Sequence, residues 1–215
     1  MKQTDHMSSI EMSSVSRRPG RPRGGHLDIG PEIILDAAER VIRRDGASAS
    51  IDAVAAEAGI TKPIVYARVG SRAELANALA DRLASRMVTA TRKSMAGRTF
   101  TRESLADFMK ANLVTVLDHR ELFLYVTGGS TDQTALSRLS LAERSATPLA
   151  RALERWRDGV GRDPGVAGTW AYAMVGMLQM VSLWVIDDTS PDPGSVADHL
   201  AELLWWGLAG ERSSG

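Results

Sequence analysis

The chain has 215 residues, 44% of them hydrophobic, which is enough to build a packed core and excludes a disordered protein. It contains no cysteine, which excludes disulfides, thiolate metal sites and cysteine nucleophiles. Basic and acidic residues both number 26, so the overall charge gives no support for a nucleic-acid partner and only its distribution is informative.

The N-terminal region differs in composition from the rest of the chain. Residues 1–25 are rich in serine, arginine, proline and glycine, and we predict that they form a disordered basic arm. The segment 17–25, RRPGRPRGG, resembles a minor-groove AT-hook, with Pro19 where the hook usually has arginine. On this interpretation Arg21 and Arg23 contact DNA, because a narrow A·T minor groove attracts arginine. The alternative is a basic linker that adds only non-specific affinity.

Three short helices are predicted after the arm. Apolar residues recur at helical spacing from Pro31, which suits the first position of a helix, and stop before Gly46. Ser50 is a suitable N-cap for a second helix and Thr61 for a third, with Gly59 ending the second. Two short helices joined by a glycine turn on a third helix are typical of a helix-turn-helix.

The third helix carries most of the candidate DNA contacts. Val65 and Val69 lie four positions apart and are expected to face the core, which leaves the other side chains for the major groove. Its charged residues suit phosphates or guanine edges, Ile64 suits a thymine methyl group, and the Tyr66 hydroxyl can reach a phosphate. The predicted DNA-contacting residues are Arg21, Arg23, Ser50, Thr61, Lys62, Pro63, Ile64, Tyr66, Arg68 and Arg72.

Residues 50–75 read SIDAVAAEAGITKPIVYARVGSRAEL. The order of a Ser-started helix, Ala-Gly-Ile-Thr-Lys, a tyrosine four residues after the lysine, and a Gly-Ser-Arg turn with an acidic-Leu pair resembles the tetracycline-repressor (TetR) family. The resemblance implies that Ser50, Lys62, Tyr66 and Arg72 contact the DNA backbone or base edges. It also implies that the remaining chain forms a ligand-binding and dimerisation domain.

The match departs from the family pattern at the end of the third helix. The family commonly has phenylalanine where Val69 stands, and an aromatic residue or histidine at Ala67 and Arg68. Valine still fills the core with less volume, but the surface facing DNA is altered. The operator sequence of other family members therefore does not transfer to this chain.

The second part of the chain is also helical in pattern, so the predicted fold class is all-α. The helix near 164–187 is apolar nearly all round, and such a helix must be buried on every side. We expect a partner subunit to cover one side, and the resemblance to the TetR family implies that the last two long helices form the homodimer interface. A membrane span is disfavoured, because Gln179 and Ser182 interrupt the stretch. The predicted helices lie near 72–93, 102–117, 120–127, 132–158, 164–187 and 194–209.

Large apolar side chains of the second part are candidates for lining an effector pocket, because methionine and tryptophan suit an adaptable cavity. The alternative is that each of them simply fills the core. Asn112 and His119 are further polar candidates. No metal site or cofactor is expected, since the Asp118-His119 region lacks a second histidine or cysteine cluster. The predicted ligand-binding residues are Phe123, Tyr125, Trp156, Trp170, Met174, Met177, Gln179 and Trp184.

The sequence thus predicts a basic arm (1–25), a helix-turn-helix DNA-binding domain (26–75) and a ligand-binding and dimerisation domain (76–215). The predicted function is a cytoplasmic transcriptional repressor that a small apolar molecule releases from double-stranded operator DNA. One alternative is a ligand-independent architectural or activating DNA-binding dimer. The other is a helical enzyme, but no G-x-S-x-G, H-E-x-x-H, G-x-G-x-x-G or P-loop signature is present.

Overall fold

The computed structural model describes residues 30–95, 98–128, 135–186 and 192–209, and the regular structure within these ranges is helical, without a strand. This confirms the predicted all-α fold class. The predicted helix over 164–187 is divided into a short 3-10 turn and a separate α-helix. The elements are α1 (Pro31–Asp45), η1 (Gly46–Ser48), α2 (Ile51–Glu57), α3 (Lys62–Val69), α4 (Arg72–Met95), α5 (Arg102–Asp118), α6 (Arg120–Gly128), α7 (Ala135–Gly159), η2 (Pro164–Val166), α8 (Ala167–Val185) and α9 (Pro193–Ala209).

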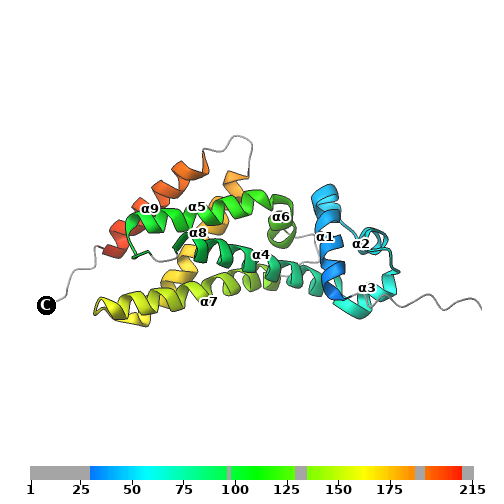
Figure 1. Ribbon diagram of the computed structural model, residues 1–215, viewed down its shortest axis with the longest axis horizontal. Coiled ribbons are helices and arrows are strands. Elements are labelled where there is room, and N and C mark those ends of the chain that lie inside the picture. The colour runs from blue at the N-terminus through cyan, green and yellow to red at the C-terminus, as the bar shows by residue number, and fades with distance from the viewer. Residues whose placement is uncertain (1–29, 96–97, 129–134, 187–191, 210–215) are drawn as a thin grey trace, which may run out of the picture.

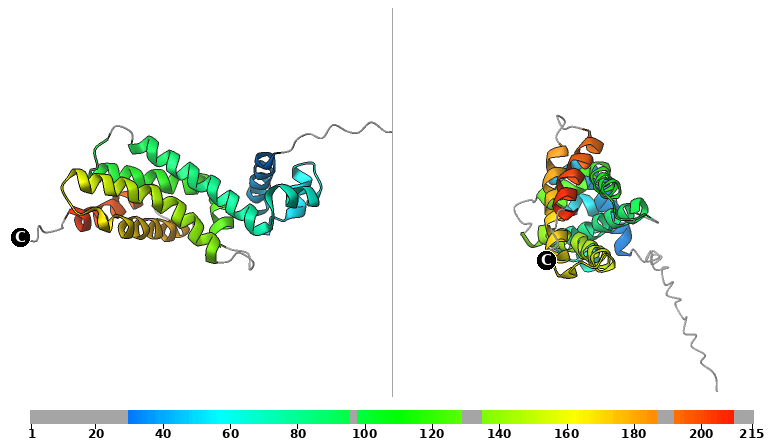
Figure 2. Two further views of the ribbon diagram at one scale, coloured as in Figure 1. Left: turned by 90° about the horizontal axis from the view of Figure 1, so that it is seen from below. Right: turned by 90° about the vertical axis from the view of Figure 1, so that its left-hand side faces the viewer.

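The molecule is elongated, with α1, α2 and α3 gathered at one end (Figure 1). Helix α4 runs from this end along the rest of the molecule, beside α5 and α7. A perpendicular view shows the same arrangement, with α4 connecting the two parts (Figure 2). A change in the direction of α4 would therefore move the first three helices relative to the others.

The small N-terminal part is held together by apolar packing rather than by helix length. Helices α2 and α3 have only seven and eight residues, and helices this short are marginal in water on their own. They are stabilised because Val54 and Val65 pack with Val41 of α1 in one core, where Val65 and Val41 have no exposed surface. Gly59, with a φ of 67°, allows the sharp turn between α2 and α3.

The larger part has a second core, formed mainly by α5, α7, α8 and α9. Met109 of α5, Leu153 of α7 and Met174 of α8 are almost completely buried in it. The closest packing is between α5 and α9 and between α7 and α8. Helices α5, α7 and α8 of this core also contribute, with α4 and α6, to the wall of the cavity described below.

Candidate DNA-binding face and ligand cavity

The start of α2 has the hydrogen bond that the sequence predicts for a capped helix. Ser50 has an extended backbone, and its hydroxyl oxygen accepts a hydrogen bond from the Ala53 amide at 3.2 Å. Thr61 occupies the corresponding position before α3 with the same extended conformation, but its side chain makes no cap bond. The Thr61 side chain is exposed, so its hydroxyl remains able to bond to a phosphate.

Helix α3 buries one face and exposes the other. Val65 is fully buried, whereas Tyr66 is 45% and Ile64 38% exposed. The predicted contact residues on this helix therefore lie on one accessible surface, which we call the α3 face. It consists of Thr61, Lys62, Pro63, Ile64, Tyr66 and Arg68, all of them exposed.

An ion pair links the α3 face to α2. The Lys62 Nζ donates to the Asp52 carboxylate at 2.9 Å, and this hydrogen bond raises the pKa of Lys62. Both side chains are largely exposed, so the pair contributes little to stability. Its consequence is electrostatic, because any phosphate that approached Lys62 would have to replace or share the Asp52 carboxylate.

Arg72 lies away from the α3 face. Its Nη2 donates to the Ala49 carbonyl at 3.2 Å, and its guanidinium carbon stands 6.0 Å from the centre of the Tyr125 ring on α6. The side chain is half-buried at the junction between the two parts of the molecule. A direct DNA contact by Arg72 would require the guanidinium to leave these partners. Arg21 and Arg23 lie outside the described residues.

A second connection between the two parts joins α1 to α4. The Arg82 guanidinium bonds to Glu32, Asp36 and Glu39 of α1, and Arg86 donates to both carboxylate oxygens of Glu39 at 2.8 Å. Burial disfavours the charge of Arg82, but the three carboxylates outweigh it and raise its pKa. We call these five residues the α1–α4 clamp, because they fix the direction of α1 against α4.

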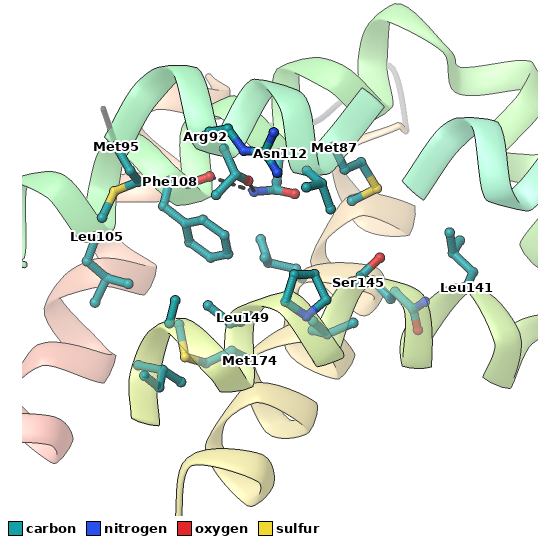
Figure 3. Close-up of a pocket in the computed structure, with 18 of the residues that line it drawn as sticks. Met87, Arg92, Met95, Leu105, Phe108, Asn112, Leu141, Ser145, Leu149 and Met174 are labelled. Carbon is teal, nitrogen blue, oxygen red and sulfur yellow. Dashed lines mark hydrogen bonds between the residues drawn. The ribbon is translucent and has the colours of Figure 1, made fainter. Parts of the chain in front are cut away.

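A cavity of about 330 Å³ lies in the second part, within the size range of small-molecule sites. Met87 of α4 and Phe108 and Asn112 of α5 lie across it from Ser145 of α7 and Met174 of α8 (Figure 3). The full lining comprises Met87, Val88, Thr91, Arg92, Met95, Phe100, Leu105, Phe108, Asn112, Phe123, Leu141, Ser145, Pro148, Leu149, Ala152, Leu153, Arg155, Met174, Val175, Leu178, Gln179 and Ser182.

The polar atoms of the wall are few and differ in how well they are bonded. The Asn112 amide nitrogen donates to the Thr91 hydroxyl at 3.0 Å and to the Phe108 carbonyl at 2.8 Å. The Ser145 hydroxyl oxygen is buried without a hydrogen-bond partner. It lies three residues before Pro148, which stands inside α7 and lacks the amide that a helix normally uses.

Three of the predicted ligand-binding residues line this cavity, namely Phe123, Met174 and Gln179. The other five lie outside its wall. Trp156 packs on Phe100, a residue of the wall, with ring centres 4.5 Å apart, but does not itself line the cavity. Met177 packs at the margin of the second core.

The remaining three of these five make other contacts or are exposed. The Trp170 ring lies under the Arg157 guanidinium at 4.3 Å, and Tyr125 faces Arg72. Trp184 is 55% exposed on α8. The cavity therefore has none of these five predicted residues in its wall: Tyr125, Trp156, Trp170, Met177 and Trp184.

Sequence reasoning did not select the lining residues of α4 and α5, apart from Asn112 as a polar candidate. Met87, Thr91 and Met95 recur every four residues along α4 and so share one face of that helix. This spacing is visible in the sequence, but α4 also carries buried apolar residues that pack against other helices. Nothing in the spacing distinguishes the face that packs from the face that borders a void.

Helices α8 and α9 leave large apolar side chains uncovered. Met180 and Trp184 of α8 are 67% and 55% exposed, and Leu203 and Trp206 of α9 are 67% and 69% exposed. Within the described residues one helical stretch, Pro164–Val185, is long and apolar enough to cross a membrane, and 33% of its apolar window is buried. Length and composition alone are weak support for a membrane span, because a helix buried at a subunit interface can be equally long and equally apolar.

Comparison with known proteins gives concordant results. The family model for bacterial regulatory proteins of the tetR family matches residues 34–79. An uncharacterized HTH-type transcriptional regulator of Mycobacterium tuberculosis is 27% identical over 187 residues, which cover 85% of this chain and 78% of the relative. The HTH-type transcriptional activator FasR of Mycolicibacterium smegmatis is 22% identical, over 94% of this chain and 97% of its own.

Solved structures share the fold. The transcriptional regulator FadR of Bacillus subtilis, crystallised in complex with stearoyl-CoA, superposes with a TM-score of 0.64 over 82% of this chain and 98% of its own. Its sequence is 18% identical, so this likeness concerns the fold.

Proposed function

We propose that the chain is a DNA-binding transcriptional regulator of the TetR family, a repressor that leaves its operator when a small, largely apolar molecule binds in the second part of the molecule. The observation that carries the proposal is the position of the cavity. Met87, Thr91 and Met95 of α4 line it, and the same helix begins directly after α3.

The α3 face is the proposed DNA-reading surface, in a DNA-binding domain that is proposed to span residues 26–75. Its exposed residues can enter a major groove because Val65 holds the helix on α1 from behind. Tyr66 and Lys62 are proposed to contact the DNA backbone, and the basic arm is proposed to add contacts beside them.

Homodimerisation through α8 and α9 is the proposed role of the uncovered apolar side chains. A helix-turn-helix dimer binds well only when its two recognition helices stand about one DNA turn apart, roughly 34–36 Å. Interfaces that pair the last two helices of each subunit would cover Met180, Trp184, Leu203 and Trp206. Because the partner partly sets the separation, a small change in the tilt of α4 changes the fit to the operator.

Two contacts carry the proposed coupling from the cavity to DNA. The first is the α1–α4 clamp, which makes α1 follow any movement of α4. The second runs through α6, where Phe123 lines the cavity and Tyr125 faces Arg72, itself bonded to the Ala49 carbonyl next to the Ser50 cap. A ligand shifts the equilibrium only if it binds the two arrangements unequally, and the proposal requires that both contacts change between them.

The relatives support an apolar effector, and one of them makes activation of transcription an alternative to repression. FadR of Bacillus subtilis was crystallised with stearoyl-CoA, a molecule with a long apolar chain. FasR is an activator by name, so activation is the second candidate for this chain. A ligand-independent architectural role is disfavoured by the cavity itself. The need to reach DNA is the reason for the proposed cytoplasmic location.

The test is operator binding by gel shift on the DNA flanking the gene for this protein, with and without long-chain ligands. Lys62→Ala and Tyr66→Ala should each weaken binding about tenfold, and Lys62→Ala should reduce the salt-dependence slope by about one unit. Lys110→Ala, an exposed lysine on α5, is the matched control and should leave affinity unchanged. Normal affinity in both α3 variants would contradict the DNA-reading surface, and no release by any ligand would contradict the sensor.

A further inference from the structure

The cavity opens between α4 and α7, at the end far from the DNA-binding domain. Of its lining residues, Arg92, Ala152 and Arg155 are exposed, whereas the others are half-buried or buried. A residue that both lines a cavity and contacts solvent marks the opening. Arg92 lies three residues before the end of α4, and Arg155 lies four residues before the end of α7. The two helices run side by side in the same direction, away from α1–α3 (Figures 1 and 2).

The charges at this opening are of one sign. Arg92 and Arg155 are the charged residues of the lining, and no acid is among its members in the described part of the chain. Neither arginine forms an ion pair with a described carboxylate. Glu154 and Asp158 share a separate shallow groove with Arg155 on the outer side of α7, and neither of them lines the cavity.

A paired arginine would be an ordinary surface charge, but two unpaired guanidinium groups at the rim of an apolar cavity favour one kind of ligand. The guanidinium fork matches the oxygens of a carboxylate or phosphate and binds them with charge-assisted hydrogen bonds. The interior, walled by side chains such as Phe108, Leu149 and Met174, offers an environment for hydrocarbon.

We propose that the effector is an anionic amphiphile, with its apolar chain inside the cavity and its anionic group held between Arg92 and Arg155 at the opening. This specifies the ligand class of the sensor proposed above and rests on that function. The anionic group is a carboxylate or a phosphate, since both suit the guanidinium fork. A neutral or cationic molecule of equal length fills the same interior but leaves the two arginines unpaired.

The experiment compares probes of one chain length, namely dodecanoate, dodecanoyl-CoA, dodecanol and dodecylamine. Binding is followed by tryptophan fluorescence, because Trp156 contacts Phe100 of the cavity wall, and operator release is followed separately. An anionic probe should bind about tenfold more tightly than dodecanol. A preference for dodecanoate identifies a carboxylate, and a preference for dodecanoyl-CoA identifies the phosphates as the anionic group.

The variants locate the preference at the opening. Arg92→Gln and Arg155→Gln should each reduce the preference for the anionic probe over dodecanol severalfold, and Arg92→Glu should shift it towards dodecylamine. Arg151→Gln is the matched control, because Arg151 is an exposed arginine one turn earlier on α7 and does not line the cavity. Circular dichroism verifies that each variant folds.

Two results would overturn the proposal. One is dodecanol or dodecylamine binding as tightly as the anionic probes, and the other is a preference that survives both glutamine substitutions. If dodecanol binds equally well and still releases the operator, the ligand class is wrong and the sensor function stands. If no probe binds and none releases the operator, both are wrong.

Discussion

The two parts of this molecule differ in how completely a single chain buries its own apolar surface. In α1–α3 the largest apolar exposures are moderate, at 47% for Ile33, 38% for Ile64 and 45% for Tyr66, and two of these residues belong to the α3 face. In α8 and α9, Met180 and Trp206 exceed 65% exposure. The second part also contains a cavity that its own side chains do not fill.

This difference separates apolar surface that the chain covers by itself from apolar surface that it leaves for another molecule. The N-terminal helices bury their apolar faces within the chain, in a core that they share with residues of α4 and α6, and two of their three exposed large apolar side chains belong to the α3 face. The larger part leaves apolar surface at two places, one outside on α8 and α9 and one inside the cavity. Both are positions at which another molecule would complete the packing.

The largest expected effect comes from placing a charge on the uncovered face of α8. We expect Met180→Glu to convert a dimer to monomers and to abolish operator binding, because a buried unpaired carboxylate costs about 3–5 kcal/mol in an interface. Sedimentation equilibrium measures the oligomeric state. Val160→Glu, at an exposed position directly after the end of α7, is the control. The proposed interface would be contradicted if the wild-type chain were monomeric, or if Met180→Glu remained a dimer with normal affinity for the operator.

The next effect concerns the α1–α4 clamp, where the two parts meet. Glu39 is 13% exposed and bonds to both Arg82 and Arg86, so Glu39→Gln leaves two cations short of a partner. The loss in free energy of unfolding should be about 1–3 kcal/mol, between the values for exposed and for buried ion pairs. Urea unfolding measures it, with Glu143→Gln on the exposed surface of α7 as control. An unchanged midpoint would mean that the clamp does not hold α1 on α4.

A smaller effect is expected within the N-terminal part. Asp52→Asn removes the carboxylate that holds Lys62 and a negative charge beside the proposed phosphate contacts. Operator affinity should rise about two- to fivefold, since one more cation becomes available to the DNA backbone. A salt titration of operator binding measures this. Weaker binding instead would show that Asp52 positions Lys62 for its contact.

The smallest effect is a pH dependence at His119, near the clamp. Burial lowers the pKa of His119, and the neighbouring Arg86 charge acts in the same direction. The unfolded chain therefore binds more protons than the folded one below the ordinary histidine pKa of about 6.5, and stability is lost as the pH falls through this range. His119→Gln should flatten the decrease in urea midpoint between pH 7 and pH 5, while His199→Gln serves as control. An identical pH profile would assign the decrease to other groups.

Local features of the sequence were sufficient for the helices and for the α3 face. The predicted helix near 102–117 is observed as Arg102–Asp118, and the one near 194–209 as Pro193–Ala209. Apolar periodicity, N-caps and glycine stops act over a few residues, so they are readable along the chain. The exposed positions on α3 follow from the same periodicity, because only Val65 and Val69 point back to the core.

The sequence by itself therefore determined the fold class, the short helices α1–α3 and the residues exposed on α3. Only the tertiary structure decided which residues surround the cavity, and it placed Trp156 and Trp170 outside the wall and Met87 and Phe108 within it. It also placed Arg72 against the Ala49 carbonyl rather than on the α3 face. The physical reason is that a cavity forms where several helices pack together, and periodicity within one helix does not specify that packing. The same holds for the bond between Arg72 and the Ala49 carbonyl, because these groups lie 23 residues apart along the chain.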